Sequence, residues 1–334
     1  MNGWVTERWW GYELAFEHPA TTFIAIGIGV VFAFAVVAIG ALTFSRKLPP
    51  ALIRELWLRT ASWLVLVLVL GIPILAGALW TMLLILAISL LCFHEYARAT
   101  GLFREKLVSF TVILGILFVF FAAIDHWYGF FQALVPLTVV GLAVISIPLD
   151  RPSGYVQRVA LAIFGFLVFG VAFGHLAFMA NDWHYRPIVL MVLIAVSLND
   201  VFAFVIGKLV GGPKLVPVTS PNKTLAGSLG AMVLTTTLVA LLAGLVFEGT
   251  TLEQWPHRIG LGLIVGALAQ LGDLMLSSIK RDLGIKDMGN TIPGHGGVLD
   301  RFNSLLLVAP ATFHYVGYFI GFGVDQPTRI FTGI

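Results

Sequence analysis

Apolar stretches of about 20 residues recur along the whole chain, and they constrain its fold more than any other feature. A helix needs roughly 20 apolar residues to cross the hydrocarbon core of a bilayer, which is about 30 Å thick. The mean hydropathy of +0.96 and the charged fraction of only 11% exclude a soluble domain of this size, whose surface would need more charge. The alternation typical of membrane β-barrels is not visible. The sequence therefore predicts an all-α fold, a polytopic helical bundle that spans a membrane.

We predict about ten spans within a single membrane domain, residues 1–334. They lie at residues 20–44, 53–75, 78–98, 107–124, 129–148, 158–180, 187–207, 225–247, 259–279 and 304–323. The stretch 53–98 is too long for one span, and Pro73 and Gly77 indicate a tight turn that divides it into two helices. Residues 1–19 lack the pattern of a cleaved signal, and their tryptophans predict an interfacial segment.

Lysine and arginine residues divide unevenly between the two sides of these spans. Placing the loops alternately on two sides puts sixteen of the twenty on one side. The other side receives only Arg8, Arg186, Arg258 and Arg329. Because positive loops stay inside, the first side is predicted to be cytoplasmic and both termini external. Residues 208–224 and 280–303 are then cytoplasmic loops, and the charge pattern places the protein in the cell inner membrane or its equivalent.

Polar side chains interrupt two of the predicted spans. Gln270, Asp273, Ser277 and Lys280 share one face of the ninth span, because their spacing follows the helical period. A carboxylate in a membrane is costly, so this stripe is either a functional site or an interhelical hydrogen-bond seam. In the seventh span Asp200 marks a second polar site.

Small residues follow Asp200 along its helix face. Ala203 and Gly207 continue that face toward the cytoplasmic side. Such residues make room for a ligand or for a neighbouring helix, and the sequence leaves both open.

The loop KRDLGIKDMGNTIPGHGGVLDRFN, residues 280–303, concentrates charge in an otherwise apolar chain. Carboxylates there, those of Asp287 and Asp300, suit a hard divalent cation. The glycine-rich turn from Gly294 to Gly297 can place backbone N–H groups around an anion. The loop also contains four cations that can bind phosphate oxygens, namely Lys280, Arg281, Lys286 and Arg301. Metal-binding carboxylates beside phosphate-binding cations predict nucleotide phosphoryl chemistry.

This loop resembles the signature of the phosphatidate cytidylyltransferases, also called CDP-diacylglycerol synthases. That signature reads approximately S, two residues, KR, four residues, KD, a short spacer, HGG, two residues, DR, any residue and a final D. The matching residues are Ser277, Lys280, Arg281, Lys286, Asp287, His295, Gly296, Gly297, Asp300 and Arg301. Upstream, the QLGD at 270–273, the ND at 199–200 and the SPNKT at 220–224 also resemble family motifs. The resemblance covers roughly residues 199–303, the motif-bearing catalytic half.

The resemblance implies a role for each matched residue. Asp273 and Asp300 would hold Mg²⁺, with a second cation as a further option, and Asp287 would assist. Lys280 and Arg281 would act in catalysis by neutralising phosphates. The remaining matched positions would bind the substrates; they are Asp200, Ser220, Lys223, Lys286, His295, Gly296, Gly297 and Arg301.

Two positions depart from the family pattern. Ala226 stands where glutamate or glutamine is frequent, and Asn303 stands where the signature ends in aspartate. An amide can still coordinate a metal but supplies no negative charge, so Asn303 predicts altered metal handling or lipid choice. The alternative is that Asn303 caps the tenth helix.

The expected reaction joins CTP and a lipid phosphate, with phosphatidate the expected lipid, into a CDP-lipid and pyrophosphate. The active site would face the cytoplasm, with membrane lipids around it and no nucleic acid as partner; a homodimer is one option for the assembly. A related CTP-dependent enzyme remains open, either a cytidylyltransferase for a non-standard phospholipid or a polyprenol-type kinase. A transporter, with Asp200 and Asp273 as ion sites, is a different class that the residues also allow.

Overall fold

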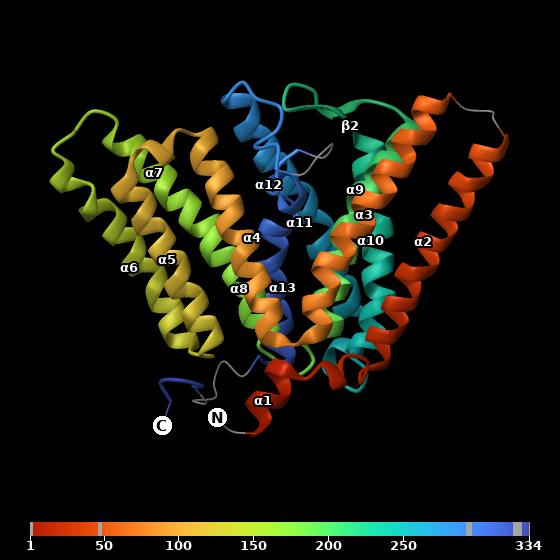
Figure 1. The fold of residues 1–334 in the computed structure, drawn as a ribbon, viewed down its shortest axis with the longest axis horizontal. Coiled ribbons are helices and arrows are strands. Elements are labelled where there is room, and N and C mark those ends of the chain that lie inside the picture. Colours follow the sequence, from red (N-terminus) through yellow and green to blue (C-terminus); the bar gives the residue numbers. More distant parts are fainter. Residues whose placement is uncertain (1–2, 46–48, 292–295, 323–328, 334) are drawn as a thin grey trace.

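A computed structural model describes residues 3–45, 49–291, 296–322 and 329–333. Long helices make up nearly all of it (Figure 1). The helices are α1 (Gly3–Trp10), α2 (Pro19–Ser45), α3 (Pro50–Ala76), α4 (Ala78–Ala99), α5 (Lys106–Ile124), α6 (Tyr128–Ile145), α7 (Tyr155–Gly165), α8 (Ala172–Ala180), α9 (Tyr185–Val210), α10 (Leu225–Val246), α11 (Trp255–Asp282), α12 (Leu299–Phe302) and α13 (Leu305–Ile320). The strands are β1 (Lys214–Val216) and β2 (Ser220–Thr224).

The membrane-spanning character predicted from the sequence is confirmed. Within the described ranges, nine helical segments are long and apolar enough to cross a membrane, with α7 and α8 counted as one segment, residues 155–180. A π-helical turn, Phe166–Val171, joins those two helices. The tenth predicted span corresponds to α13, an apolar helix of 16 residues. The protein is therefore an all-α integral membrane protein, and each predicted span has a helix.

The division between the second and third spans falls where the sequence indicated. Gly77 separates α3 from α4 with a φ of 151°, a conformation that favours glycine. A Cβ atom at this position would lie only 2.0 Å from the carbonyl oxygen of Trp9. Glycine is therefore needed both for the turn and for the close approach of α1.

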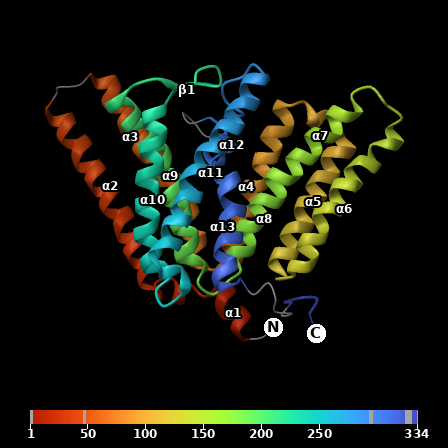
Figure 2. The same cartoon turned by 180° about the vertical axis from the view of Figure 1, so that it is seen from behind.

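The two ends of the bundle differ in what they carry. Figures 1 and 2 show α1 and the C-terminal residues at one end, and the β-hairpin and α12 at the other. At the first end Asp125 accepts hydrogen bonds from the backbone of Phe331 and Thr332. Trp9 is buried there and donates to Asn181, so its side chain packs within the protein.

The segment 208–224, predicted as a loop, is more ordered than the sequence indicated. Helix α9 extends to Val210, and the antiparallel pair β1–β2 follows, with Val216 opposite Ser220. Thr224 ends the hairpin and caps α10, because its side-chain oxygen accepts a hydrogen bond from the amide of Gly227. The hairpin thereby fixes where Lys223 stands, one residue before the cap.

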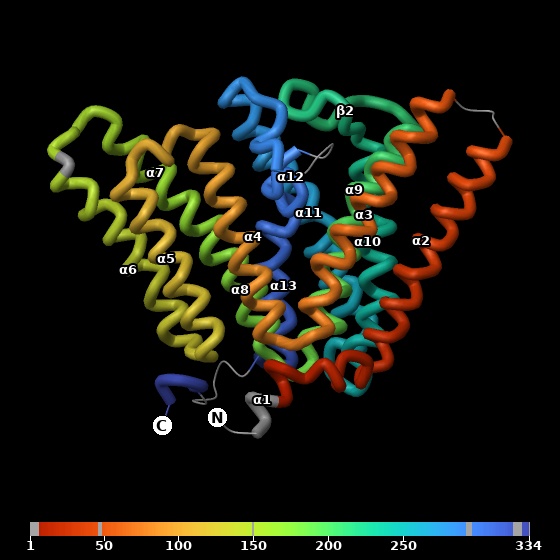
Figure 3. The backbone as a smooth tube through the Cα atoms, in the orientation of Figure 1, coloured from red at the N-terminus to blue at the C-terminus, as the bar shows by residue number. Residues whose placement is uncertain are grey.

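Close helix packing places α9, α10 and α11 side by side, as the tube trace in Figure 3 shows. A Cβ atom on Gly227 of α10 would lie 2.5 Å from the carbonyl oxygen of Ala203 and 2.9 Å from the Cα of Gly207. The small residues that follow Asp200 therefore admit a neighbouring helix, which decides between the two alternatives that the sequence left open.

Candidate active site

Asp273 on α11 lies between a lysine of the hairpin and an amide that follows α12. Its Oδ2 forms an ion pair with Lys223 Nζ at 2.5 Å. Its Oδ1 accepts a hydrogen bond from Asn303 Nδ2 at 2.6 Å. The carboxylate is 22% exposed and Lys223 is 18% exposed, so the pair is shielded but reachable from solvent. Segments from three parts of the chain thus meet at Asp273.

Asp200 on α9 belongs to the same site. Its carboxylate interacts electrostatically with Asp273, Lys223 and Arg301. The Asp200 side chain is itself exposed. Two carboxylates and two cations therefore lie within electrostatic reach of one another, as the motifs predicted.

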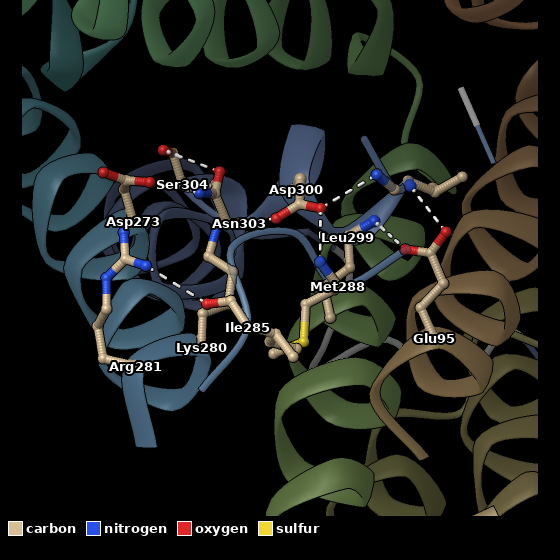
Figure 4. A network of polar contacts seen from close by, with 12 residues as sticks. Glu95, Asp273, Lys280, Arg281, Ile285, Met288, Leu299, Asp300, Asn303 and Ser304 are labelled. Atoms are coloured by element: carbon tan, nitrogen blue, oxygen red, sulfur yellow. Dashed lines mark hydrogen bonds and ion pairs between the residues drawn. The ribbon is translucent and has the colours of Figure 1, made fainter. Parts of the chain in front are cut away.

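Asp300 occupies a more enclosed position. Its Oδ1 pairs with Lys280 Nζ at 2.8 Å, and its Oδ2 accepts the backbone amides of Met288 at 2.9 Å and Gly297 at 3.0 Å. The side chain is only 7% exposed. Asp300 therefore holds the loop together, as its contact with Met288 in Figure 4 shows. The Gly297 amide, which the sequence analysis assigned to a phosphate, donates to Asp300 instead.

Arg281 connects the two motif-bearing loops. Its Nε donates to the carbonyl oxygen of Thr219 in the hairpin at 3.2 Å, and an Nη donates to that of Ile285 at 3.4 Å. The side chain is exposed, so it can also reach a ligand in solvent. The hairpin and the end of α11 are thus tied together beside Asp273.

The remaining predicted residues of the loop lie near this centre or outside the described ranges. Lys286 and Asp287 are exposed. Gly296 has a φ of 81°, and a Cβ atom there would lie 3.1 Å from Asp300 Oδ2 and 3.4 Å from Asp287 Oδ1. Ser220 begins β2 and pairs with β1. His295, predicted to bind substrate, lies outside the described residues.

The oxygen ligands at this site fit a magnesium ion. No group of three or more His, Cys, Asp or Glu side chains able to hold a metal gathers within the described part of the chain. Magnesium, however, is usually held by one or two carboxylates together with waters and substrate phosphates. Asp273 and the exposed Asp200 supply two interacting carboxylates. In Asp300, by contrast, Oδ2 already accepts two backbone amides. Only Oδ1, which pairs with Lys280, could bind a metal ion.

Comparison with known proteins identifies the family. The model of the cytidylyltransferase family matches residues 57–319, from within α3 to the end of α13. The chain belongs to this family. It is therefore a nucleotidyltransferase, and the match includes the first helices as well as the half that carries the motifs.

Individual relatives agree with this membership. The protein YnbB of Escherichia coli (strain K12), which is described as uncharacterized, is 31% identical over 280 residues, 81% of this chain and 91% of its own length. The phosphatidate cytidylyltransferase of Staphylococcus aureus (strain COL) is 39% identical over 151 residues, 43% of this chain and 56% of that protein. The phosphatidate cytidylyltransferase of Rickettsia bellii is 30% identical over 200 residues, 59% of this chain and 76% of that protein.

One residue of this candidate site was not anticipated from the sequence. Glu95, near the end of α4, is buried with 6% exposure and accepts hydrogen bonds from Thr291, Val298 and Leu299. Figure 4 shows Glu95 beside Leu299. The only sequence signal was a carboxylate near the end of an apolar span, far from every motif. Its partners are about 200 positions away, so no local pattern could reveal them.

The polar side chains on one face of α11 serve both as an interhelical seam and as part of the candidate site, the two roles that the sequence left open. Gln270 accepts a hydrogen bond from the Ser228 side chain and donates to the Ser228 carbonyl oxygen on α10 at 3.0 Å. That half of the stripe is an interhelical seam. Asp273 and Lys280, one and three turns further on, belong to the charged centre instead.

Proposed function

We propose that this protein joins CTP and a lipid phosphate into a CDP-lipid and pyrophosphate, with phosphatidate as the lipid. An oxygen of the lipid phosphate attacks the α-phosphorus of CTP, a new P–O bond forms, and the bond to the β-phosphate breaks in line with it. The lipid phosphate is already ionised at neutral pH, so the reaction needs no strong general base. Its main requirement is charge cancellation between two polyanions, followed by alignment.

The observation that carries the proposal is the pairing of both predicted metal-binding carboxylates with predicted phosphate-binding lysines. Lys223 pairs with Asp273, and Lys280 pairs with Asp300. Without a ligand, each lysine neutralises a carboxylate that would otherwise stand unpaired at low dielectric. When phosphates enter, the same lysines can turn to phosphate oxygens and leave the carboxylates to a cation.

The proposed division of labour follows from these contacts. Asp273 would hold Mg²⁺, with Asp200 or the Oδ1 atom of Asp300 as the second carboxylate. Bound there, the ion would supply positive charge to the polyphosphate as pyrophosphate leaves. Lys223 and Lys280 would neutralise phosphates, and Arg281 would orient the hairpin toward them.

The location of the site suits one soluble and one lipid substrate. Asp273 lies on α11, about two and a half turns before that membrane-spanning helix ends at Asp282. We propose that this end faces the cytoplasm, because it carries most of the lysine and arginine residues. CTP then arrives from water while the acyl chains stay in the bilayer. The similarity to the phosphatidate cytidylyltransferases of Staphylococcus aureus and Rickettsia bellii supports phosphatidate as the lipid.

The proposal is tested by assaying the purified protein with CTP labelled on the α-phosphate. A panel of lipid phosphates separates the substrates: phosphatidate of several acyl compositions, lysophosphatidate and a polyprenyl phosphate. We expect label to enter phosphatidate at the highest rate. Faster labelling of another lipid would replace phosphatidate as the substrate and keep the reaction. Absence of label from every lipid would refute the proposed reaction.

A further inference from the structure

Glu95 holds the signature loop from a helix outside the motif-bearing half of the chain. Its Oε1 accepts hydrogen bonds from Thr291 Oγ1 at 2.6 Å and from the Val298 amide at 3.0 Å. Its Oε2 accepts the Leu299 amide at 2.8 Å. The side chain is only 6% exposed, so water has little access to these hydrogen bonds. A buried carboxylate that accepts several hydrogen bonds is a strong anchor, since bonds to a charged group are stronger than neutral ones.

Glu95 and Asp300 hold the same backbone through adjacent amides. Asp300 Oδ2 accepts the amides of Met288 and Gly297, and Glu95 accepts the next two, those of Val298 and Leu299. The three consecutive amides of residues 297–299 therefore donate hydrogen bonds to two carboxylates. The position of Asp300 Oδ1, and with it the Lys280 ion pair, depends on a backbone that Glu95 fixes.

Two glycines of the loop make room for the Glu95 carboxylate. A Cβ atom on Gly289 would lie 2.6 Å from Glu95 Oε1, and one on Gly297 would lie 2.4 Å from Oε2. Contacts this short do not occur at real Cβ atoms, so a side chain at either position would displace the carboxylate or the loop. At Gly297 the glycine is thus explained by the approach of Glu95, independently of any phosphate.

We infer that Glu95 is a positioning residue of the cytidylyltransferase reaction. It fixes the backbone at 297–299 so that Asp300 and Lys280 stand where the phosphates meet. Among the described residues its hydrogen bonds go to Thr291, Val298 and Leu299, and none goes to the side chain of Asp300 or Lys280, so it acts through the loop. This inference rests on the proposed function.

Glu95→Gln is the variant that separates positioning from folding. Glutamine has the same shape, but its Nε2 would face a backbone N–H as a second donor, so at least one of the three bonds is lost. We expect kcat to fall about 10- to 100-fold, since small misplacements of catalytic groups cost that much. The KM for CTP should change much less. Yield and gel-filtration profile should stay close to those of the unaltered protein. The thermal midpoint should fall modestly, because at least one buried backbone donor loses its acceptor.

Glu105→Gln is the matched control. Glu105 lies at the same end of the bundle, 3.9 Å from Arg158, and it is 29% exposed. It does not contact the loop in the described residues. Its neutralisation removes one carboxylate from the same region, so full activity is expected.

Hydrogen exchange measured by mass spectrometry reports on the anchor without any assay of activity. Peptides that contain the amides of Val298 and Leu299 should exchange faster in Glu95→Gln than in the unaltered protein or in Glu105→Gln. Gly289→Ala gives a second test, because its steric conflict is with the Glu95 side chain. The added exchange caused by Gly289→Ala should be smaller in a Glu95→Ala background than alone.

The outcomes separate this inference from the proposed function. An active unaltered protein, together with a Glu95→Gln variant of equal kcat or unchanged exchange at 298–299, would overturn the inference alone. A Glu95→Gln variant that raises KM for CTP while keeping kcat would also overturn it, because that split indicates lost binding. An unaltered protein that labels no lipid would refute the proposed function and the catalytic role of Glu95 together, whatever the exchange shows.

Discussion

The side-chain amide of Asn303 donates a hydrogen bond of 2.6 Å to Asp273, the carboxylate that also pairs with Lys223. The Asn303 Oδ1 accepts from the Ser304 amide at 2.8 Å, so both ends of its side chain are engaged. The N-cap of the final helix, α13, is Ser304 and not Asn303, so the capping alternative is wrong. Asn303 stands directly beside the carboxylate that we propose to hold magnesium.

Asn303→Asp should make the site more dependent on magnesium. The change replaces a donor with a second carboxylate against Asp273, which costs stability without a cation and attracts a divalent one. We expect the metal-free variant to unfold at a lower temperature than the unaltered protein. Added Mg²⁺ should raise the thermal midpoint of the variant more than that of the unaltered protein. Half-maximal activity should need less Mg²⁺. Thermal unfolding and activity are both measured across a magnesium titration.

Asn290→Asp is the control for that titration. It adds the same charge to the same loop at an exposed position. Curves that superimpose for Asn303→Asp and the unaltered protein would remove position 303 from metal handling.

Asp273→Asn and Asp300→Asn should both reduce turnover by far more than tenfold, which corresponds to about 1.4 kcal/mol of transition-state stabilisation. Their effects on folding should differ. Asp300 accepts two backbone amides inside the loop, so its replacement should also lower the thermal midpoint. Asp273 accepts side-chain partners only, and its variant should unfold closer to the unaltered protein. A variant that keeps more than about a tenth of the rate does not belong to the catalytic centre.

The orientation in the membrane can be tested with a single cysteine. In a Cys92→Ala background, a cysteine replaces Asn290, which is exposed on the signature loop. Cys92 itself is fully buried. An impermeant thiol reagent should modify the new cysteine only after the cells are opened, because the charge distribution predicts a cytoplasmic loop. Modification in intact cells would reverse the proposed orientation.

Gly227→Ala should weaken the packing that brings Asp200 beside Asp273. A Cβ atom there would lie 2.5 Å from the Ala203 carbonyl oxygen, which is too close for contact. Forcing the helices apart should cost about 1–3 kcal/mol of stability. The same change at Gly141, where a Cβ atom would meet nothing within 4 Å, is the control. Equal thermal midpoints for the two variants would contradict the tight α9–α10 contact.

The spans could be predicted from the sequence because each depends only on a local run of apolar residues. The same holds for the division at Gly77, where one residue type permits the turn. The hairpin around Ser220 was read as a loop, because short polar strands leave no clear periodicity. Trp9 is buried against Asn181 and Phe331, and these partners could not be read from the local sequence because they lie far from Trp9 in the chain.

The candidate site was predictable where its residues lie in motifs, and not where they meet only in space. Asp200, Lys223 and Asp273 were all named from the sequence, and helix packing brings them together. The pairing of Lys280 with Asp300 could not be read from spacing, because the loop between them has no regular period. Glu95 was missed for the same reason, since its partners come from the other half of the chain.

The central claim is tested most directly by following both ends of CTP in one assay. CTP labelled on the α-phosphate and CTP labelled on the γ-phosphate are supplied in parallel, with phosphatidate, to the unaltered protein and to Asp273→Asn. We predict that α-label enters the lipid with one pyrophosphate released per molecule, that γ-label stays out of the lipid, and that Asp273→Asn abolishes the transfer. Entry of γ-label into the lipid would indicate a kinase, and no transfer of either label to phosphatidate or to any other lipid phosphate would contradict the proposed reaction.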